Sequence, residues 1–145
     1  MKLKYLIITL AILGFSCNNN TWETNSPLVS IIKLNSAEEL GDFEEAVKYQ
    51  NISKLYGGYA REKSITPEAY WKAEILANND IAKDKRFTNR IKYFNYDISE
   101  NILDSNAEVI FKNKNHEARI REIIYKLELL NAVWVVQEIE YNLKK

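Results

Sequence analysis

The chain has very few of the residues that usually build metal sites, disulfides and catalytic triads. Its 145 residues include one cysteine and one histidine. These numbers exclude an internal disulfide framework and a multi-cysteine zinc site, and they leave little for a histidine-based metal site or triad. Twenty basic residues balance twenty acidic ones, so the positive field that drives nonspecific nucleic-acid binding is missing. We therefore expect no metal, no cofactor, no catalytic residue and no nucleic-acid partner.

The composition that remains is that of one foldable domain. Hydrophobic residues make up 46% of the chain and charged residues 28%, the balance of an ordinary globular protein. The amino terminus has a different organisation. Lys2 and Lys4 precede an apolar run from Tyr5 to Phe15, which at about 1.5 Å per residue would cover about half of a bilayer's hydrocarbon core. Residues 1–16 are therefore predicted to be a secretory signal peptide rather than a spanning helix.

The end of this leader resembles the lipobox of bacterial lipoproteins, in the sequence Leu13-Gly14-Phe15-Ser16-Cys17. In that family the cysteine thiol takes a diacylglyceryl group and becomes the first residue of the mature protein. The resemblance implies lipidation of Cys17 and a membrane partner held through the lipid anchor, which two or more acyl chains make stable. The alternative is a plain secretory signal with an incidental cysteine.

The residues after Cys17 bear on where such an anchor would hold the protein. Asn18, rather than an aspartate, follows the cysteine. This resembles the default outer-membrane route of bacterial lipoproteins, so we expect a place in the cell envelope, with the outer membrane favoured over the inner. Residues 17–35 are interpreted as the lipidated cysteine and a flexible tether, because the stretch before Pro27 is polar and lacks apolar periodicity. The apolar run over 28–34 is interpreted as a strand or an arm packed on the domain.

Helices are predicted before strands. Ser36 begins a capping box that starts a first helix, and Gly57-Gly58 is expected to bend or end it. Thr66-Pro67 starts a second helix, which should run to about Phe87. Apolar periodicity of two then predicts four antiparallel strands, over Ile91–Ile98, Ala107–Lys112, Ile120–Leu129 and Val133–Tyr141. The expected fold class is α+β, with N-terminal helices packed in a curved four-stranded antiparallel sheet.

The hairpin from Ile124 to Ile139, with Asn131-Ala132 at its turn and Trp134 after it, resembles the closing hairpin of a known superfamily. This is the nuclear-transport-factor-two-like superfamily of cystatin-like cone folds, in particular its lumazine-binding-like branch of bacterial lipoproteins. Ala107–Phe111 is similar to the preceding strand there. The resemblance implies a cone-shaped domain over 36–143. In that superfamily a bent sheet wraps a long helix, and the cavity serves as an active site, a ligand pocket or core.

Three functions follow as hypotheses. The first is a non-enzymatic envelope lipoprotein that binds a small ligand or a partner protein. Its ligand-binding candidates are tyrosines near the glycine pair, which offer apolar rings with polar tips: Tyr49, Tyr56, Tyr59 and Tyr70. The second is an acid–base enzyme of the ketosteroid-isomerase type, for which Asp97 with Tyr93 or Tyr96 is the nearest grouping, although Asp97 also fits a solvated strand end. The third is an immunity or accessory protein that docks through its sheet face.

Overall fold

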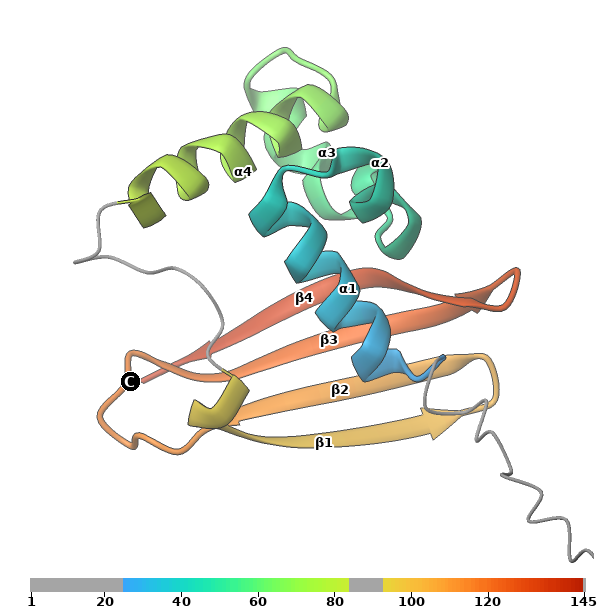
Figure 1. Ribbon diagram of the computed structural model, residues 1–145, viewed down its shortest axis with the longest axis vertical. Helices are drawn as coiled ribbons and strands as arrows, with labels where there is room; N and C mark the ends of the chain where they lie inside the picture. Colours follow the sequence, from blue (N-terminus) through green and yellow to red (C-terminus); the bar gives the residue numbers. More distant parts are fainter. Residues whose placement is uncertain (1–24, 84–92, 145) are drawn as a thin grey trace, which may run out of the picture.

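The computed structural model describes residues 25–83 and 93–144 (Figure 1). The predicted signal peptide, the lipidation site Cys17 and the stretch between Lys83 and Tyr93 therefore lie outside the described residues. The helical elements are α1 (Pro27–Leu40), α2 (Phe43–Ala46), the 3-10 turn η1 (Val47–Tyr49), α3 (Ile52–Glu62), α4 (Pro67–Lys83) and the 3-10 turn η2 (Tyr93–Asn95). The strands are β1 (Tyr96–Leu103), β2 (Asn106–Asn113), β3 (Ile120–Leu130) and β4 (Val133–Leu143).

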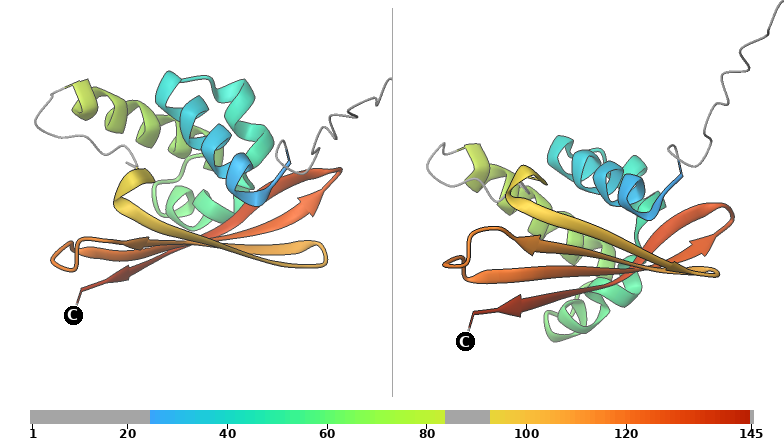
Figure 2. Two further views of the ribbon diagram at one scale, coloured as in Figure 1. Left: turned by 60° about the horizontal axis from the view of Figure 1, so that its bottom comes forward. Right: turned by 90° about the horizontal axis from the view of Figure 1, so that it is seen from below.

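The four strands form one open antiparallel sheet in the order β1-β2-β3-β4. The predicted α+β class with four antiparallel strands is confirmed at this level. Helix α1 lies across one face of the sheet, which we call the inner face, while α3 and α4 lie toward the β4 side (Figures 1 and 2). The residues just before α3 lie beside β4, because Gln50 bridges to Val136 and the Asn51 amide donates to the Val136 carbonyl at 2.8 Å.

Helix α1 corrects two predictions. Residues 28–34 are helical rather than a strand or arm, and Ser36 lies inside the helix rather than at its start. Ser26 caps the helix, since its hydroxyl accepts from the Val29 amide at 3.2 Å, and Gly41 ends it in the left-handed region at φ 71°. Its buried residues recur at helical spacing: Pro27, Ser30, Ile31, Leu34 and Ala37. Residues assigned to the tether thus pack into the domain.

The expectation for the glycine pair is also wrong. Gly57 and Gly58 lie in the interior of α3, which Asn51 caps by accepting from the Lys54 amide at 3.1 Å. The predicted start of α4 is confirmed, because the Thr66 hydroxyl accepts from the Ala69 amide at 3.1 Å and Pro67 is the first helical residue. The predicted end near Phe87 lies outside the described residues.

The strand predictions are confirmed for β2 to β4 and shifted for β1, which begins at Tyr96 and continues past the predicted end at Ile98 to Leu103. The reason is pairing, since β1 matches β2 residue for residue from Tyr96↔Asn113 to Leu103↔Asn106. Asn131 and Ala132 form the turn between β3 and β4 with φ of 49° and 63°. Both positive angles fit the type I′ geometry that a two-residue hairpin prefers.

The core lies between the inner face and α1. Alternate residues of β2 to β4 are buried there, including Val109 and Phe111, Tyr125 and Leu127, and Trp134 and Val136. The outer face carries charged residues instead, where Lys126 bonds to Glu138 at 3.2 Å and also to Glu140. This alternation is that of a sheet with one face toward solvent.

Candidate functional site

A partly buried carboxylate is the most unusual side chain beside the core. Glu38 lies in α1, and its Oε1 accepts from Trp71 Nε1 at 2.7 Å and from Gln50 Nε2 at 3.1 Å. Trp71 and Gln50 thus donate to the same carboxylate oxygen of Glu38. Burial raises the pKa of Glu38 above its ordinary value, although the hydrogen bonds from Trp71 and Gln50 act in the opposite direction. A carboxyl group held this way tends toward the neutral form more than an exposed one does.

Tyrosines from three other elements share the surroundings of Glu38. Burial raises the pKa of Tyr56 on α3, of Tyr125 on β3 and of Tyr141 on β4, and the charge of Glu38 raises each of them further. Tyr125 is buried at 3% exposure, whereas Tyr141 keeps 55% of its surface exposed. The site therefore extends from the core to solvent.

The polar residues of α1 also engage the inner face one turn before Glu38. Asn35 Nδ2 donates to the Tyr93 hydroxyl at 3.0 Å, and a hydrogen bond with Asn35 opposes the rise in the pKa of Tyr125. Asn35 and Glu38 thus put an amide and a carboxylate on the same side of α1, facing Tyr93 on η2 and Tyr125 on β3.

Further rings continue this group outward. Tyr59 on α3 and Tyr70 on α4 stack with centroids 5.8 Å apart and planes at 14°, and Tyr56 lies 6.3 Å from Tyr70. Tyr59 is 59% exposed, and its charge contributes to the raised pKa of Tyr141. We call Tyr56, Tyr59, Tyr70 and Tyr141 the tyrosine cluster. It carries four hydroxyl groups beside one partly buried carboxylate, where α3 packs against α4 and β4.

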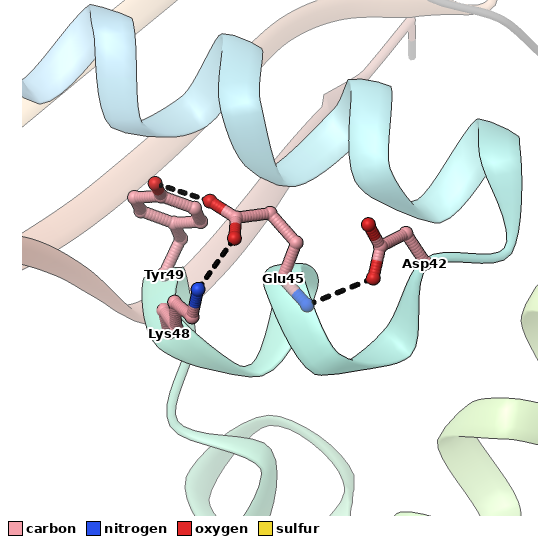
Figure 3. A network of polar contacts seen from close by, with 4 residues as sticks. All are labelled: Asp42, Glu45, Lys48 and Tyr49. Atoms are coloured by element: carbon pink, nitrogen blue, oxygen red, sulfur yellow. Dashed lines mark hydrogen bonds and ion pairs between the residues drawn. The ribbon is translucent and has the colours of Figure 1, made fainter.

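The structure brings together three of the four tyrosines proposed from the sequence. Tyr49 is separate from Tyr56, Tyr59 and Tyr70. It is buried on η1, where its hydroxyl donates to Glu45 at 2.7 Å in a network with Lys48 and Asp42 (Figure 3). Burial and the Glu45 carboxylate raise the pKa of Tyr49 to about 12. These contacts make Tyr49 part of the link between α2 and α3.

The grouping of Asp97 with Tyr93 or Tyr96 does not form. The Asp97 side chain is 73% exposed and lies 3.6 Å from Lys114 Nζ. Tyr93 and Tyr96 instead contact Phe111 on the inner face, with ring centroids 5.9 and 6.0 Å away. Within 25–83 and 93–144, no three histidine, cysteine, aspartate or glutamate side chains come close enough to hold a metal ion.

Sequence reasoning missed Glu38, Tyr125 and Tyr141. The sequence predicts a helix that starts at Ser36, but in a helix that runs from Pro27 to Leu40, Glu38 lies in the last turn, with its carboxylate toward Trp71 and Gln50. The buried positions Ile31, Leu34 and Ala37 are the available signal, because Glu38 follows them at helical spacing on the same stripe. Tyr125 and Tyr141 alternate with charged residues, which places both on the inner face.

A surface pocket of about 440 Å³ lies elsewhere, lined by Phe94, Asn95, Asn113, Lys114 and Asn115. The Asn113 side chain bonds within the loop that forms the pocket. Its Oδ1 accepts from the Asn115 amide at 2.9 Å and its Nδ2 donates to the Ile120 carbonyl at 3.3 Å. Lys114 Nζ likewise donates to the Phe94 carbonyl at 3.2 Å. These side chains hold the turn, so the tyrosine cluster is the better candidate site.

No protein-family model, curated protein or solved structure matches this chain. The candidate site is therefore defined by the residues of this chain alone. In the part of the chain that the structure describes, no helix has the length and apolar character to cross a membrane.

Proposed function

We propose that this protein is a cell-envelope lipoprotein, anchored through Cys17, whose domain binds a small ligand at the tyrosine cluster. The observation that carries the binding role is Glu38, a partly buried carboxylate beside tyrosines of which Tyr59 and Tyr141 are more than half exposed. A tyrosine offers a flat apolar ring and a polar tip, which suits recognition of small molecules. The anchor is supported by the basic, apolar and small-residue order of the leader.

We further propose that the domain is of the nuclear-transport-factor-two-like type and does no chemistry on its ligand. The order of elements supports this, since helices precede a four-stranded antiparallel meander and α1 lies on its inner face. In that arrangement the ligand site would lie between the helices and the inner face, where Glu38 and Tyr125 are found.

A test of this function separates the anchor from the ligand site. Cys17→Ser should release the protein from membranes or leave it as an unprocessed precursor, and normal processing with unchanged fractionation would contradict the anchor.

For the site, a panel of small molecules should raise the melting temperature of the native protein and have less effect on that of Tyr59→Ala. Phe94→Ala is the matched control, because Phe94 is also an exposed ring, at 75%. If the panel raises the melting temperatures of both variants equally, the ligand site lies outside the tyrosine cluster.

A second candidate function, an acid–base enzyme, is favoured by one observation. Burial raises the pKa of Glu38, and the Tyr141 and Tyr56 hydroxyls share its surroundings. Such a carboxylate could remove a proton beside a carbonyl while a tyrosine hydroxyl stabilises the oxyanion. Glu38→Gln distinguishes the two functions. The enzyme function would be established if the native protein turns over a bound ketone and Glu38→Gln still binds the ketone without turning it over.

A further inference from the structure

We propose that the tyrosine cluster recognises an organic cation, a substituted ammonium group. This inference rests on the proposed ligand-binding function and adds the chemical class of the ligand. Its first basis is geometry. Tyr59 and Tyr70 stack at 5.8 Å with planes 14° apart, and Tyr56 flanks Tyr70 at 6.3 Å. Because Tyr59 is 59% exposed, the stack leaves ring surface open to solvent.

The second basis is the sign of the neighbouring charges. Acidic side chains act on Tyr56, Tyr70 and Tyr141, namely Glu38, Glu62 and Glu74. Glu74 also forms a hydrogen bond with the Tyr70 hydroxyl. The nearby ammonium of Lys72 is turned to other partners, since it pairs with Glu68 at 2.6 Å and lies 5.6 Å from the Phe43 ring. Three carboxylates therefore act on the tyrosines of the cluster.

These two properties select a cation. An aromatic face carries partial negative charge and attracts a cation, and carboxylates nearby add to that attraction. An anion would be repelled by Glu38, Glu62 and Glu74. A neutral apolar molecule would gain contact with the rings but nothing from the charges. A bare metal ion would need several converging ligand oxygens, and the described residues do not gather three such groups. A substituted ammonium uses the rings and the carboxylates together.

The test compares choline with its neutral isostere 3,3-dimethylbutan-1-ol, which has the same shape and no charge. The processed full chain, extracted in detergent, is titrated with each compound, and tryptophan fluorescence reports binding because Trp71 donates to Glu38. Sodium chloride at equal concentration is the ionic-strength control. We expect saturable binding of choline, about tenfold tighter than the alcohol, as a cation–π contribution of about 1–2 kcal/mol implies.

Variants then assign the effect to the cluster. Tyr59→Leu, at an exposed position, should weaken choline binding about tenfold by removing a ring face. Tyr59→Phe keeps the ring and should retain most of the affinity, and Phe94→Leu is the control for an exposed ring outside the cluster. Circular dichroism of each variant checks that it is folded.

Two results would overturn the cation inference. Equal affinity for choline and the alcohol would identify an apolar ligand and leave the proposed binding function standing. No binding of either compound, together with no response to the wider panel of molecules, would reject the binding function as well. If choline binds only when presented as a phosphatidylcholine vesicle, and Tyr59→Leu abolishes this, the cation is a lipid headgroup rather than a free compound, and the inference stands.

Discussion

The indole N–H of Trp71 donates a 2.7 Å hydrogen bond to the carboxylate of Glu38, which joins α4 to α1 inside the protein. Trp71 is 1% exposed and also meets Phe43 edge to face at 5.2 Å. Gln50 adds a second donor to the same carboxylate oxygen. One carboxylate thus holds together α1, α4 and the link that pairs with β4, so its protonation state bears on the stability of the helical layer.

The first prediction concerns Glu38→Gln. Burial raises the pKa of Glu38 above its ordinary value of 4.5, so the folded state binds this proton more tightly than the unfolded chain does. The stabilisation of the fold by protonated Glu38 is fully present below pH 4.5. It is lost as the pH rises through the higher pKa that Glu38 has in the folded state. Glutamine keeps an oxygen for Trp71 and does not ionise. The free energy of unfolding of Glu38→Gln, minus that of the native protein, should therefore increase as the pH rises, by about 1.4 kcal/mol for each tenfold difference in proton affinity between the folded and unfolded states.

Urea denaturation between pH 4 and pH 8 measures that difference. Glu44→Gln, at an exposed position on α2, is the control for removing one negative charge. A difference for Glu38→Gln that stays constant or falls with pH would show that the carboxyl is not held toward its neutral form.

The second prediction concerns the glycine pair. An alanine methyl group at Gly58 would meet no atom within 4 Å, and Gly58 lies in the interior of α3. Gly58→Ala should therefore raise the free energy of unfolding by about 1 kcal/mol, because glycine costs a helix that much relative to alanine. Gly41→Ala is the matched control, with the opposite sign expected. There the space is equally open, but φ is 71°, a conformation that alanine rarely adopts. Denaturation curves that move in the same direction for both variants would contradict this account.

What the sequence predicts follows from how local the signals are. The start of α4 depends on neighbours, Thr66 and Pro67, and is predicted correctly. The strands after Asn106 also follow from their own alternation. Helix α1 is missed because its cap, Ser26, lies in a polar stretch and its run of β-branched residues looks like a strand. The helical period set by Ile31, Leu34 and Ala37 prevails, because it buries one side of the helix against the sheet.

The candidate site was predictable only in part for the same reason. Tyr56, Tyr59 and Tyr70 were found by their closeness to the glycine pair, although the pair does not break the helix as expected. Glu38 could not be identified as a site residue, because its two donors, Gln50 and Trp71, come from elements that only the tertiary fold brings to it. Tyr49 was included because it is near in sequence, yet it faces Glu45 instead.

The third prediction concerns the turn between β3 and β4. Ala132 has φ of 63°, where a side chain meets its own backbone and costs about 1–2 kcal/mol relative to glycine. Ala132→Gly should therefore stabilise the protein by about 1 kcal/mol, since glycine's extra freedom in the unfolded chain offsets part of the relief. Ala77→Gly, at an exposed position in α4, is the control and should destabilise by about 1 kcal/mol. The thermal midpoints of the two variants measure both effects, and a destabilised Ala132→Gly would mean that the turn conformation is not strained.

The last prediction concerns Trp134, the second residue after that turn. It is 5% exposed on the inner face, where its register partner is Leu129 on β3. Trp134→Ala should lower the free energy of unfolding by about 3–5 kcal/mol, because it removes a large buried ring and leaves a cavity. Phe94→Ala should change it by less than about 0.5 kcal/mol, since that ring is already in solvent. A loss below about 1 kcal/mol for Trp134→Ala, measured by urea unfolding, would mean that the hairpin does not close over the core, and the inner-face position of Tyr125 and Tyr141 beside Glu38 would then be in question as well.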